Sequence, residues 1–181
     1  MSRLSVIHPE EATGQAKELF AGIKKAVGKV PNAYATMGTH SPAALGVILQ
    51  ADGVLSQGSL TGVDIEAIKL VISEISGCDY CLAAHTMIGK TMGLSSDEMK
   101  RLRAGQPSGN AKRDALVRFV RRLASTSGTV PEDAVADVRA AGYTEPQLIE
   151  TILAISVITF TNLVNRVNDT IVDFPQAPAA A

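Results

Sequence analysis

Aromatic side chains are scarce in this chain of 181 residues. They make up 4% of the sequence, and tryptophan is absent. The core must therefore be built from alanine, leucine, isoleucine and valine, with methionine filling irregular gaps. Such a set of side chains suits closely packed helices. The length fits one domain with a sizeable core better than two domains.

An excess of charge of either sign is also missing, since the formal net charge is −1. One short basic cluster has helical spacing and lies beside Asp114; it consists of Arg118, Arg121 and Arg122. Phosphate binding normally needs a larger basic footprint than this. We therefore interpret the cluster as a solvated helix face and expect no nucleic-acid partner.

Long apolar runs are missing as well. No uninterrupted run reaches the roughly 18 apolar residues of a membrane span, and the first residues, MSRLSVIHPEEA, lack the apolar stretch of a secretory signal. The only two cysteines are three residues apart, whereas a secreted disulfide framework joins distant segments. We expect a cytoplasmic protein with no membrane partner, in which the cysteine pair serves chemistry.

Helix signals follow one another with short breaks, while alternating patterns flanked by hairpin dipeptides are missing. The sequence therefore predicts an all-α fold. We expect a single domain over residues 1–172 and a C-terminal tail, residues 173–181, that is loosely ordered or docked on a neighbour. The first helix is expected to start after His8 and to run to Val27, where Gly28 stops it.

Short polar motifs mark further helix starts. Ser41 with Pro42 predicts one of them. The capping-box pattern, in which Ser or Thr is followed three residues later by Glu or Gln, predicts others. This pattern occurs at Ser95 to Glu98, Thr129 to Glu132 and Thr144 to Gln147.

A broadly apolar segment runs from about Asp64 to Ile75 and is then interrupted by Ser76 and Gly77. Its apolar residues are spread too widely around the helical wheel for a one-sided surface helix, so we expect burial on most faces. A second helix is predicted to follow, with Ser76 as its cap and Cys78 in its first turn.

Cys78, Cys81 and His85 fall on one stripe of this second helix. Thiols at positions i and i+3 can form a disulfide, and a helix N-terminus lowers the pKa of a thiol by favouring the thiolate. One turn beyond Cys81, the His85 imidazole could accept the thiol proton or pair with the thiolate. The spacing predicts a redox-active dithiol with a histidine base.

Other interpretations of this motif remain. A zinc site normally needs three or four ligands, and the motif has no second cysteine pair, while His8 and His40 lack ligand spacing. We expect no metal and no cofactor. A thioredoxin fold would need βαβ patterning on both sides of the motif. Alternatively, the cysteines pack as small apolar groups beside a satisfied core histidine.

The stretch from residue 66 to residue 85 resembles the core motif of the AhpD-like alkylhydroperoxidase and carboxymuconolactone decarboxylase family. In that motif a Glu is followed at twelve residues by Cys-x-x-Cys-x-x-x-His. The residues that fit are Glu66, Cys78, Cys81 and His85. The likeness covers residues 40–105, with the core motif at 64–90, and residues 162–168 are similar to the later part of peroxidase-related members. It implies an AhpD-like helical bundle, a homo-oligomer and hydroperoxide reduction.

The resemblance also implies a role for each motif residue. Cys81 attacks the hydroperoxide substrate, and Cys78 resolves the sulfenic acid that forms. Glu66 and His85 belong to a proton relay, and a cellular thiol reductant that the sequence does not identify restores the dithiol. The best-known members have a histidine immediately before the second cysteine, where this chain has Tyr80, a poor base near neutrality.

Two further questions stay open at this point. Glu74, four residues before Cys78, is a rival carboxylate for the site, or else a solvated or interface charge. The alternative functions are a carboxymuconolactone decarboxylase-type enzyme, whose members typically do not depend on a dithiol, and a non-enzymatic redox-sensing helical oligomer.

The spacing of the motif recurs near the C-terminus. The residues in step with it are Glu150, Asn162, Asn165 and Asp169. A duplication would give a second helix pair without thiols, packed against the first around a pseudo-two-fold axis. Alternatively, the asparagines cap helices or form interhelical hydrogen bonds, because buried amides need partners.

Overall fold

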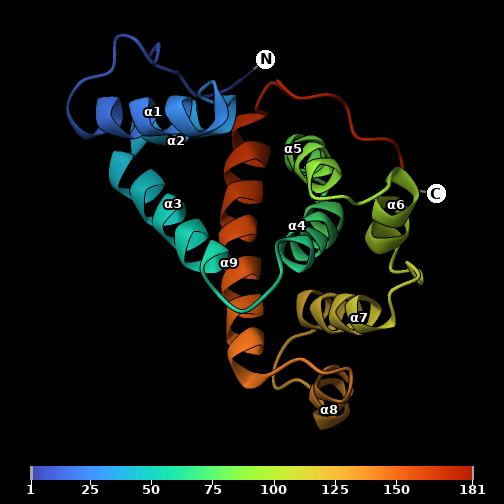
Figure 1. Cartoon of the computed structure of the whole chain (residues 1–181). Coiled ribbons are helices and arrows are strands. Elements are labelled where there is room, and N and C mark those ends of the chain that lie inside the picture. Colours follow the sequence, from blue (N-terminus) through green and yellow to red (C-terminus); the bar gives the residue numbers. More distant parts are fainter. Residues whose placement is uncertain (1, 181) are drawn as a thin grey trace.

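The computed structural model describes residues 2–180, which form helices joined by short turns and contain no strand (Figure 1). The all-α prediction is confirmed. In chain order the helices are α1 (Gly14–Val27), α2 (Asn32–His40), α3 (Pro42–Ser56), α4 (Gly62–Ser76), α5 (Asp79–Thr91), α6 (Ser96–Ala104), α7 (Ala111–Ser125), α8 (Glu132–Ala140) and α9 (Glu145–Asn168).

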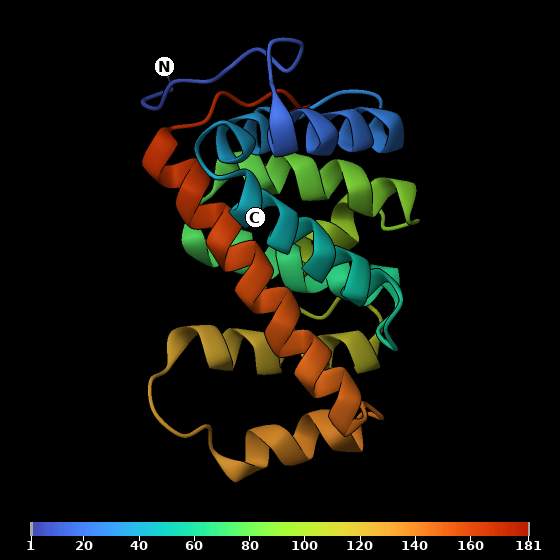
Figure 2. The ribbon, with the colours of Figure 1, turned by 90° about the vertical axis from the view of Figure 1, so that its left-hand side faces the viewer.

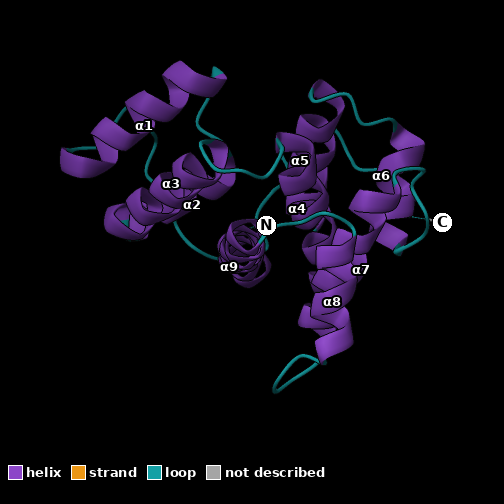
Figure 3. Ribbon diagram, turned by 60° about the horizontal axis from the view of Figure 1, so that its bottom comes forward, coloured by secondary structure: helices purple, strands orange, loops and turns teal. Residues whose placement is uncertain are grey.

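Helix α9 runs through the middle of the molecule. Seen nearly along its axis, α1–α3 lie on one side of it and α4–α8 on the other (Figure 3). The view from the side shows α9 crossing the neighbouring helices diagonally (Figure 2). Helix α4 contacts α5, α6, α7 and α9, and every residue from Asp64 to Ser73 is buried. The prediction that this segment is covered on most faces is confirmed.

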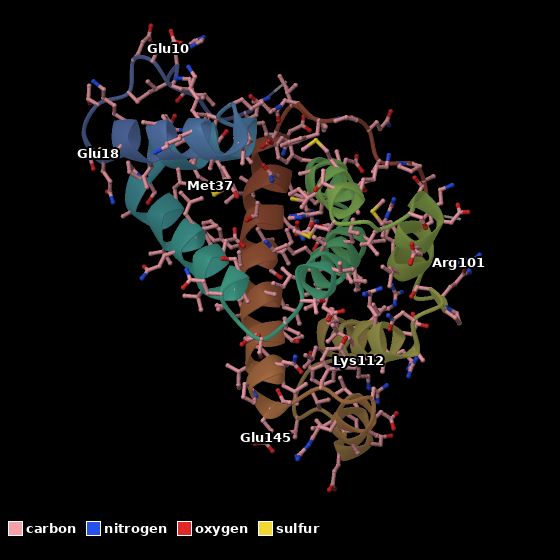
Figure 4. The ribbon with its side chains drawn as sticks, viewed as in Figure 1. Glu10, Glu18, Met37, Arg101, Lys112 and Glu145 are labelled. Carbon is pink, nitrogen blue, oxygen red and sulfur yellow. The ribbon has the colours of Figure 1, made fainter. Side chains whose placement is uncertain are left out.

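Several predicted helix boundaries are confirmed. Gly28 ends α1 in the left-handed region, and Ser41 caps α3. The capping boxes that begin with Ser95 and Thr144 are both complete. Glu18 on α1 and Glu145 at the start of α9 are exposed on the surface (Figure 4).

The predicted starts of α1 and α8 are wrong. Helix α1 begins at Gly14 rather than after His8, because a turn closed by a hydrogen bond from the Glu11 N–H to the His8 carbonyl comes first. Helix α8 has Pro131 as its N-cap, without a side-chain cap from Thr129. The extended conformation that Pro131 adopts starts the helix after it and leaves Thr129 outside the first turn.

The junction between α4 and α5 sets the position of the cysteines. Gly77 takes a left-handed conformation, with φ of 64°, and ends α4. Ser76 is the last residue of α4, so its predicted role as the cap of the next helix is wrong. Cys78 takes that role, and its Sγ accepts a hydrogen bond from the Cys81 N–H at 3.4 Å.

The C-terminal segment does not form the second helix pair that a duplication would give. It forms one uninterrupted helix, α9, because the position that corresponds to Gly77 is Thr161, which continues the helix. The asparagines form interhelical hydrogen bonds, as the alternative interpretation predicted. Asn162 contacts Ser73 and Ser76 on α4, at 3.2 and 3.1 Å.

One face of α9 carries exposed apolar side chains, namely Ile149, Ile152, Phe160, Leu163 and Val167. Among the described residues, α9 is the one helix whose length and composition would allow it to cross a membrane. The homo-oligomer stays a prediction, and a second copy of the chain would cover this face.

The C-terminal tail packs on the chain's own surface. After α9 it passes over the end of α5 towards α6 (Figure 1). The Arg103 guanidinium donates a hydrogen bond to the Pro178 carbonyl at 2.6 Å, and the Lys29 Nζ pairs with the Asp173 carboxylate at 2.8 Å. These contacts place the tail beside the cysteine motif.

Candidate functional site

The two cysteines lie in direct contact at the N-terminus of α5. Both are free and buried, and their Sγ atoms are 2.7 Å apart. Cys78 precedes the helix and Cys81 lies within its first turn, so the left-handed turn at Gly77 directs both sulfurs to the same place. The fold therefore brings the two predicted cysteines into contact.

The shared hydrogen bond divides the charge unequally between the thiols. The pKa of Cys78 is lowered, chiefly because the Cys81 thiol donates to its sulfur, and the positive charge of Arg166 acts in the same direction. The pKa of Cys81 is raised, because it gives up this hydrogen bond when it ionises and because it is buried. The shared hydrogen bond thus favours a negative charge on the Cys78 sulfur.

A buried amide completes the surroundings of the second thiol. Asn165 on α9 donates from Nδ2 to the Sγ of Cys81 at 3.3 Å. Its Oδ1 is buried without a hydrogen-bond partner in the described part of the chain. The recurring spacing aligned Asn165 with Cys81 in the sequence, but it gave no sign that the two side chains meet.

His85 and Glu66 form a second pair. The His85 Nδ1 lies 2.8 Å from the Glu66 Oε2, and both side chains are largely buried. The carboxylate fixes the orientation of the imidazole and leaves Nε2 for another partner. Within residues 2–180, no hydrogen bond joins this imidazole to either sulfur. The structure thus arranges the four predicted residues as two hydrogen-bonded pairs.

Glu74, the rival carboxylate, has a different partner. Its Oε2 accepts a hydrogen bond from the Nε of Arg103 at 2.7 Å. Arg103 also holds the tail through the Pro178 carbonyl. Glu74 therefore belongs to an ion pair between α4 and α6, as its interpretation as an interface charge predicted.

An apolar cavity of about 190 Å³ adjoins the site. Cys81 and His85 both line it, whereas Cys78 does not. The rest of its wall is mainly apolar or aromatic and includes Tyr34, Tyr80, Ala84, Met87, Ile88 and Phe174. A molecule in this cavity would meet the Cys81 thiol and the imidazole together.

Tyr80 does not take the place of a relay histidine. Its hydroxyl donates to the Asp173 Oδ1 at 2.7 Å and accepts from the Ala33 N–H at 3.1 Å. Its ring packs edge to face with Phe174. Burial raises the pKa of the phenol further above its usual value. Tyr80 therefore joins α5 to α2 and to the tail.

Tyr34 is a residue of the cavity that the sequence did not indicate. Its pKa is raised, first by burial and then by the negative charges of Asp52, Cys81 and Glu66. A phenol that stays protonated beside these groups can donate a hydrogen bond into the cavity. No spacing links Tyr34 to the cysteine motif, since α2 comes close to α5 only in the folded chain.

A metal site is not formed by the described residues, which contain no group of three or more His, Cys, Asp or Glu side chains placed to share an ion. The site thus consists of a thiol pair, an oriented imidazole and an apolar cavity. Such an arrangement can exchange electrons through sulfur and move a proton through the imidazole.

Comparison with known proteins gives the same family that the motif resembles. Residues 42–118 match the carboxymuconolactone decarboxylase family. No curated protein matches the sequence significantly.

Solved structures share the fold over nearly the whole chain. A peroxidase-related protein with an alkylhydroperoxidase AhpD core, from Ralstonia eutropha JMP134, is 18% identical with a TM-score of 0.83, covering 95% of this chain and 92% of its own. A peroxidase-related protein from Silicibacter sp. TM1040 is 17% identical with a TM-score of 0.80, covering 99% and 96%.

The debrominase Bmp8 also has this fold. A cysteine-to-alanine variant of it, solved in complex with 2,3,4-tribromopyrrole, is 17% identical to this chain with a TM-score of 0.79. The alignment covers 96% of this chain and 94% of that one. At these identities the likeness shows an AhpD-like fold.

Proposed function

We propose that this chain, whose residues 42–118 match the carboxymuconolactone decarboxylase family and which has an AhpD-like fold, reduces organic hydroperoxides with the dithiol of Cys78 and Cys81. One observation carries the proposal. Cys81 and His85 line the same apolar cavity, and the sulfur of Cys78 lies 2.7 Å from the sulfur of Cys81. A peroxide in the cavity would meet an attacking thiol, and a resolving thiol would be within reach.

The first step oxidises Cys81. After the thiol loses its proton, the sulfur attacks the terminal oxygen of ROOH and the O–O bond breaks. The hydroxyl stays on sulfur as a sulfenic acid, and the alkoxide RO⁻ takes up one proton and leaves as an alcohol. The hydrogen bond from the Asn165 Nδ2 stabilises the anionic sulfur before attack.

The imidazole of His85 is the group that moves this proton. It lines the same cavity, and Glu66 holds it through Nδ1, so that Nε2 can accept the proton of Cys81 and return it to the alkoxide. Glu66 acts through His85 and is a positioning residue. This assignment keeps the four residues that the sequence motif indicates.

The second step forms the disulfide. The thiolate of Cys78 attacks the Cys81 sulfur, the S–O bond breaks, and the departing hydroxide takes one proton to become water. Over both steps, two thiols and ROOH give one disulfide, one alcohol and one water. The lowered pKa of Cys78 suits this role, because the resolving sulfur must attack as a thiolate.

The cavity favours an organic substrate over hydrogen peroxide. Its wall is largely apolar, with Met87, Ile88 and Phe174 among its members. Burying the alkyl group of a hydroperoxide there would contribute on the order of 25 cal/mol for each Å² removed from water. Hydrogen peroxide has no such group, so its rate of reaction should be lower.

Reductive debromination of a small aromatic compound is a second candidate. The aromatic rings of Tyr34, Tyr80 and Phe174 in the wall of the cavity favour a flat ring beside Cys81. Two thiols and a bromoarene would give a disulfide, the debrominated arene and HBr. Bromide release from 2,3,4-tribromopyrrole, measured beside consumption of cumene hydroperoxide, distinguishes the two reactions.

The proposal is tested by oxidation of the reduced protein with cumene hydroperoxide. We expect one disulfide per chain, one cumyl alcohol per disulfide, and sustained consumption when dithiothreitol is present. Loss of thiols without turnover would instead support a redox-sensing protein. A chain that resists oxidation by both substrates would favour decarboxylase-type chemistry, which typically does not depend on a dithiol.

A further inference from the structure

A second cavity reaches the dithiol from another side. It measures about 300 Å³, and its wall is mostly polar. Cys78 lines it, together with Asp79, Asn165, Arg166, Asp169 and Val172. Cys81 lines the apolar cavity but not the polar one, and Cys78 lines the polar cavity but not the apolar one. Each sulfur thus faces its own opening.

Tyr80 separates the two cavities. It is the residue that lines both, and its hydroxyl is held between the Asp173 carboxylate and the Ala33 N–H. Asp173 is held in turn by Lys29, whose Nζ lies 2.8 Å from Oδ2. The tail and α2 therefore fix Tyr80 as a wall between the openings.

We propose that the thiol reductant attacks Cys78 through the polar cavity, while the hydroperoxide reaches Cys81 through the apolar one. This inference rests on the proposed function and assigns its two half-reactions to separate openings. Substrate and reductant then do not compete for space, and the oxidised enzyme can be reduced while the alcohol still occupies the apolar cavity.

Two side chains of the polar cavity suit an attacking thiolate. The Arg166 guanidinium favours a negative charge at Cys78, whereas the Asp79 carboxylate in the same wall opposes it more strongly, so the cavity suits an anionic sulfur chiefly because its wall is polar. Asn165 lies behind the pair, with Nδ2 on the Cys81 sulfur and a buried Oδ1 that lacks a partner in the described structure. Its amide can stabilise Cys81 as the leaving thiolate.

Reduction of the Cys78–Cys81 disulfide takes two thiol–disulfide exchanges. The reductant thiolate bonds to the Cys78 sulfur, the Cys78–Cys81 bond breaks, and Cys81 leaves as a thiolate that takes up a proton. The second thiol of a dithiol reductant then loses its proton and attacks the reductant sulfur that is bonded to Cys78. A disulfide forms within the reductant, and Cys78 is expelled as a thiolate.

Leaving-group ability alone would favour attack of the reductant at Cys81 rather than at Cys78. Cys78 has the lower pKa, so it would leave more readily than Cys81, which favours attack at Cys81. Access decides against this, because attack on Cys81 would have to come through the apolar cavity, where an anionic thiolate loses its hydration.

Chemical trapping identifies the sulfur that is attacked. The unmodified protein is oxidised with diamide, mixed briefly with 2-mercaptoethanol, quenched in acid, unfolded and alkylated before peptide mass spectrometry. We expect the mercaptoethanol adduct on Cys78 and the alkyl group on Cys81. The adduct on Cys81 would overturn the inference. Diamide replaces the hydroperoxide, so this result does not depend on the proposed function.

Blocking variants test the two openings separately. Val172→Trp narrows the polar cavity, Ala84→Leu narrows the apolar one, and Ile171→Trp is a matched control, because Ile171 is exposed and lines neither. We expect Val172→Trp to slow reduction of the disulfide by dithiothreitol on the order of tenfold, because access is lost. Its oxidation by cumene hydroperoxide should match the parent.

The apolar-cavity variant should show the converse. Ala84→Leu should slow oxidation by cumene hydroperoxide and leave reduction by dithiothreitol at the parent rate. Equal slowing of both half-reactions by Val172→Trp, relative to Ile171→Trp, would overturn the assignment of separate openings. Absence of any oxidation in the parent would instead count against the proposed function alone.

Discussion

The Asn165 amide lies 3.3 Å from the Cys81 sulfur and connects the central helix α9 to the dithiol of α5. Asn162, one turn earlier on the same helix, makes the corresponding contacts to Ser73 and Ser76 on α4. The two amides are equally well buried, but only Asn165 contacts sulfur. They therefore form a matched pair for separating stability from chemistry.

Replacing Asn165 by Ala should slow the oxidation of Cys81 by cumene hydroperoxide by about tenfold, because the thiolate loses a hydrogen bond worth roughly 1.5 kcal/mol. Stopped-flow measurement of thiol loss checks this. Asn162→Ala should lower the free energy of unfolding by about 1–3 kcal/mol. Its oxidation rate should stay near that of the parent. Equal rate losses in the two variants would contradict the role of Asn165.

Replacing His85 by Ala should lower the rate of oxidation by about 10² to 10⁴, the usual contribution of a general acid and base. Glu66→Gln should give a smaller loss of the same kind, because the imidazole keeps its place in the cavity but loses the carboxylate that orients it. The measurement is single-turnover formation of cumyl alcohol.

Glu74→Gln is the control for Glu66→Gln. It removes a carboxylate from the same helix, but one that pairs with Arg103 on α6. Its oxidation rate should stay within about twofold of the parent, as for a group outside the site. A loss as large as that of Glu66→Gln would return Glu74 to the list of catalytic candidates.

Replacing Tyr80 by Phe should release the tail without removing catalysis. The variant keeps the ring but loses the hydrogen bonds to Asp173 and Ala33, at a cost of about 1 kcal/mol. We expect faster proteolysis after residue 169 and an oxidation rate within about threefold of the parent. A loss of two orders of magnitude would mean that the phenol takes part in proton transfer after all.

Replacing Leu163 by Glu should disrupt a homo-oligomer. Leu163 lies on the exposed apolar face of α9, where a second copy would bury it, and an unpaired charge there is costly. Light scattering should find an oligomer for the parent and a smaller species for the variant. The apolar face of α9 and the family likeness support the expected oligomer. A monomeric parent would contradict it.

Most of the successful sequence predictions rested on local signals. The turn at Gly77, the two confirmed capping boxes and the stripe of Cys78, Cys81 and His85 all arise within one or two turns of helix, so spacing predicts them. Cys78 was predicted in the first turn of α5 and proved to be its N-cap, a difference that the left-handed Gly77 explains.

Contacts between distant segments could not be predicted in this way. Tyr34 comes from α2, Asn165 from α9 and Asp173 from the tail, and each reaches the motif only through tertiary packing. The role of Tyr80 has the same origin, because its partners lie 47 and 93 residues away. The possible helix pair near the C-terminus was one of two interpretations of a recurring spacing, and α9 continues through Thr161 without a break.

Hydroperoxide reduction by Cys81 is the central claim, and the most direct test compares the parent with Cys81→Ser and Cys78→Ser. Reduced proteins are mixed with one equivalent of cumene hydroperoxide, and alcohol and sulfenic acid are followed over time. We predict no alcohol from Cys81→Ser, and one alcohol with a persistent sulfenic acid on Cys81 from Cys78→Ser. Parent-like alcohol formation by Cys81→Ser would contradict the account.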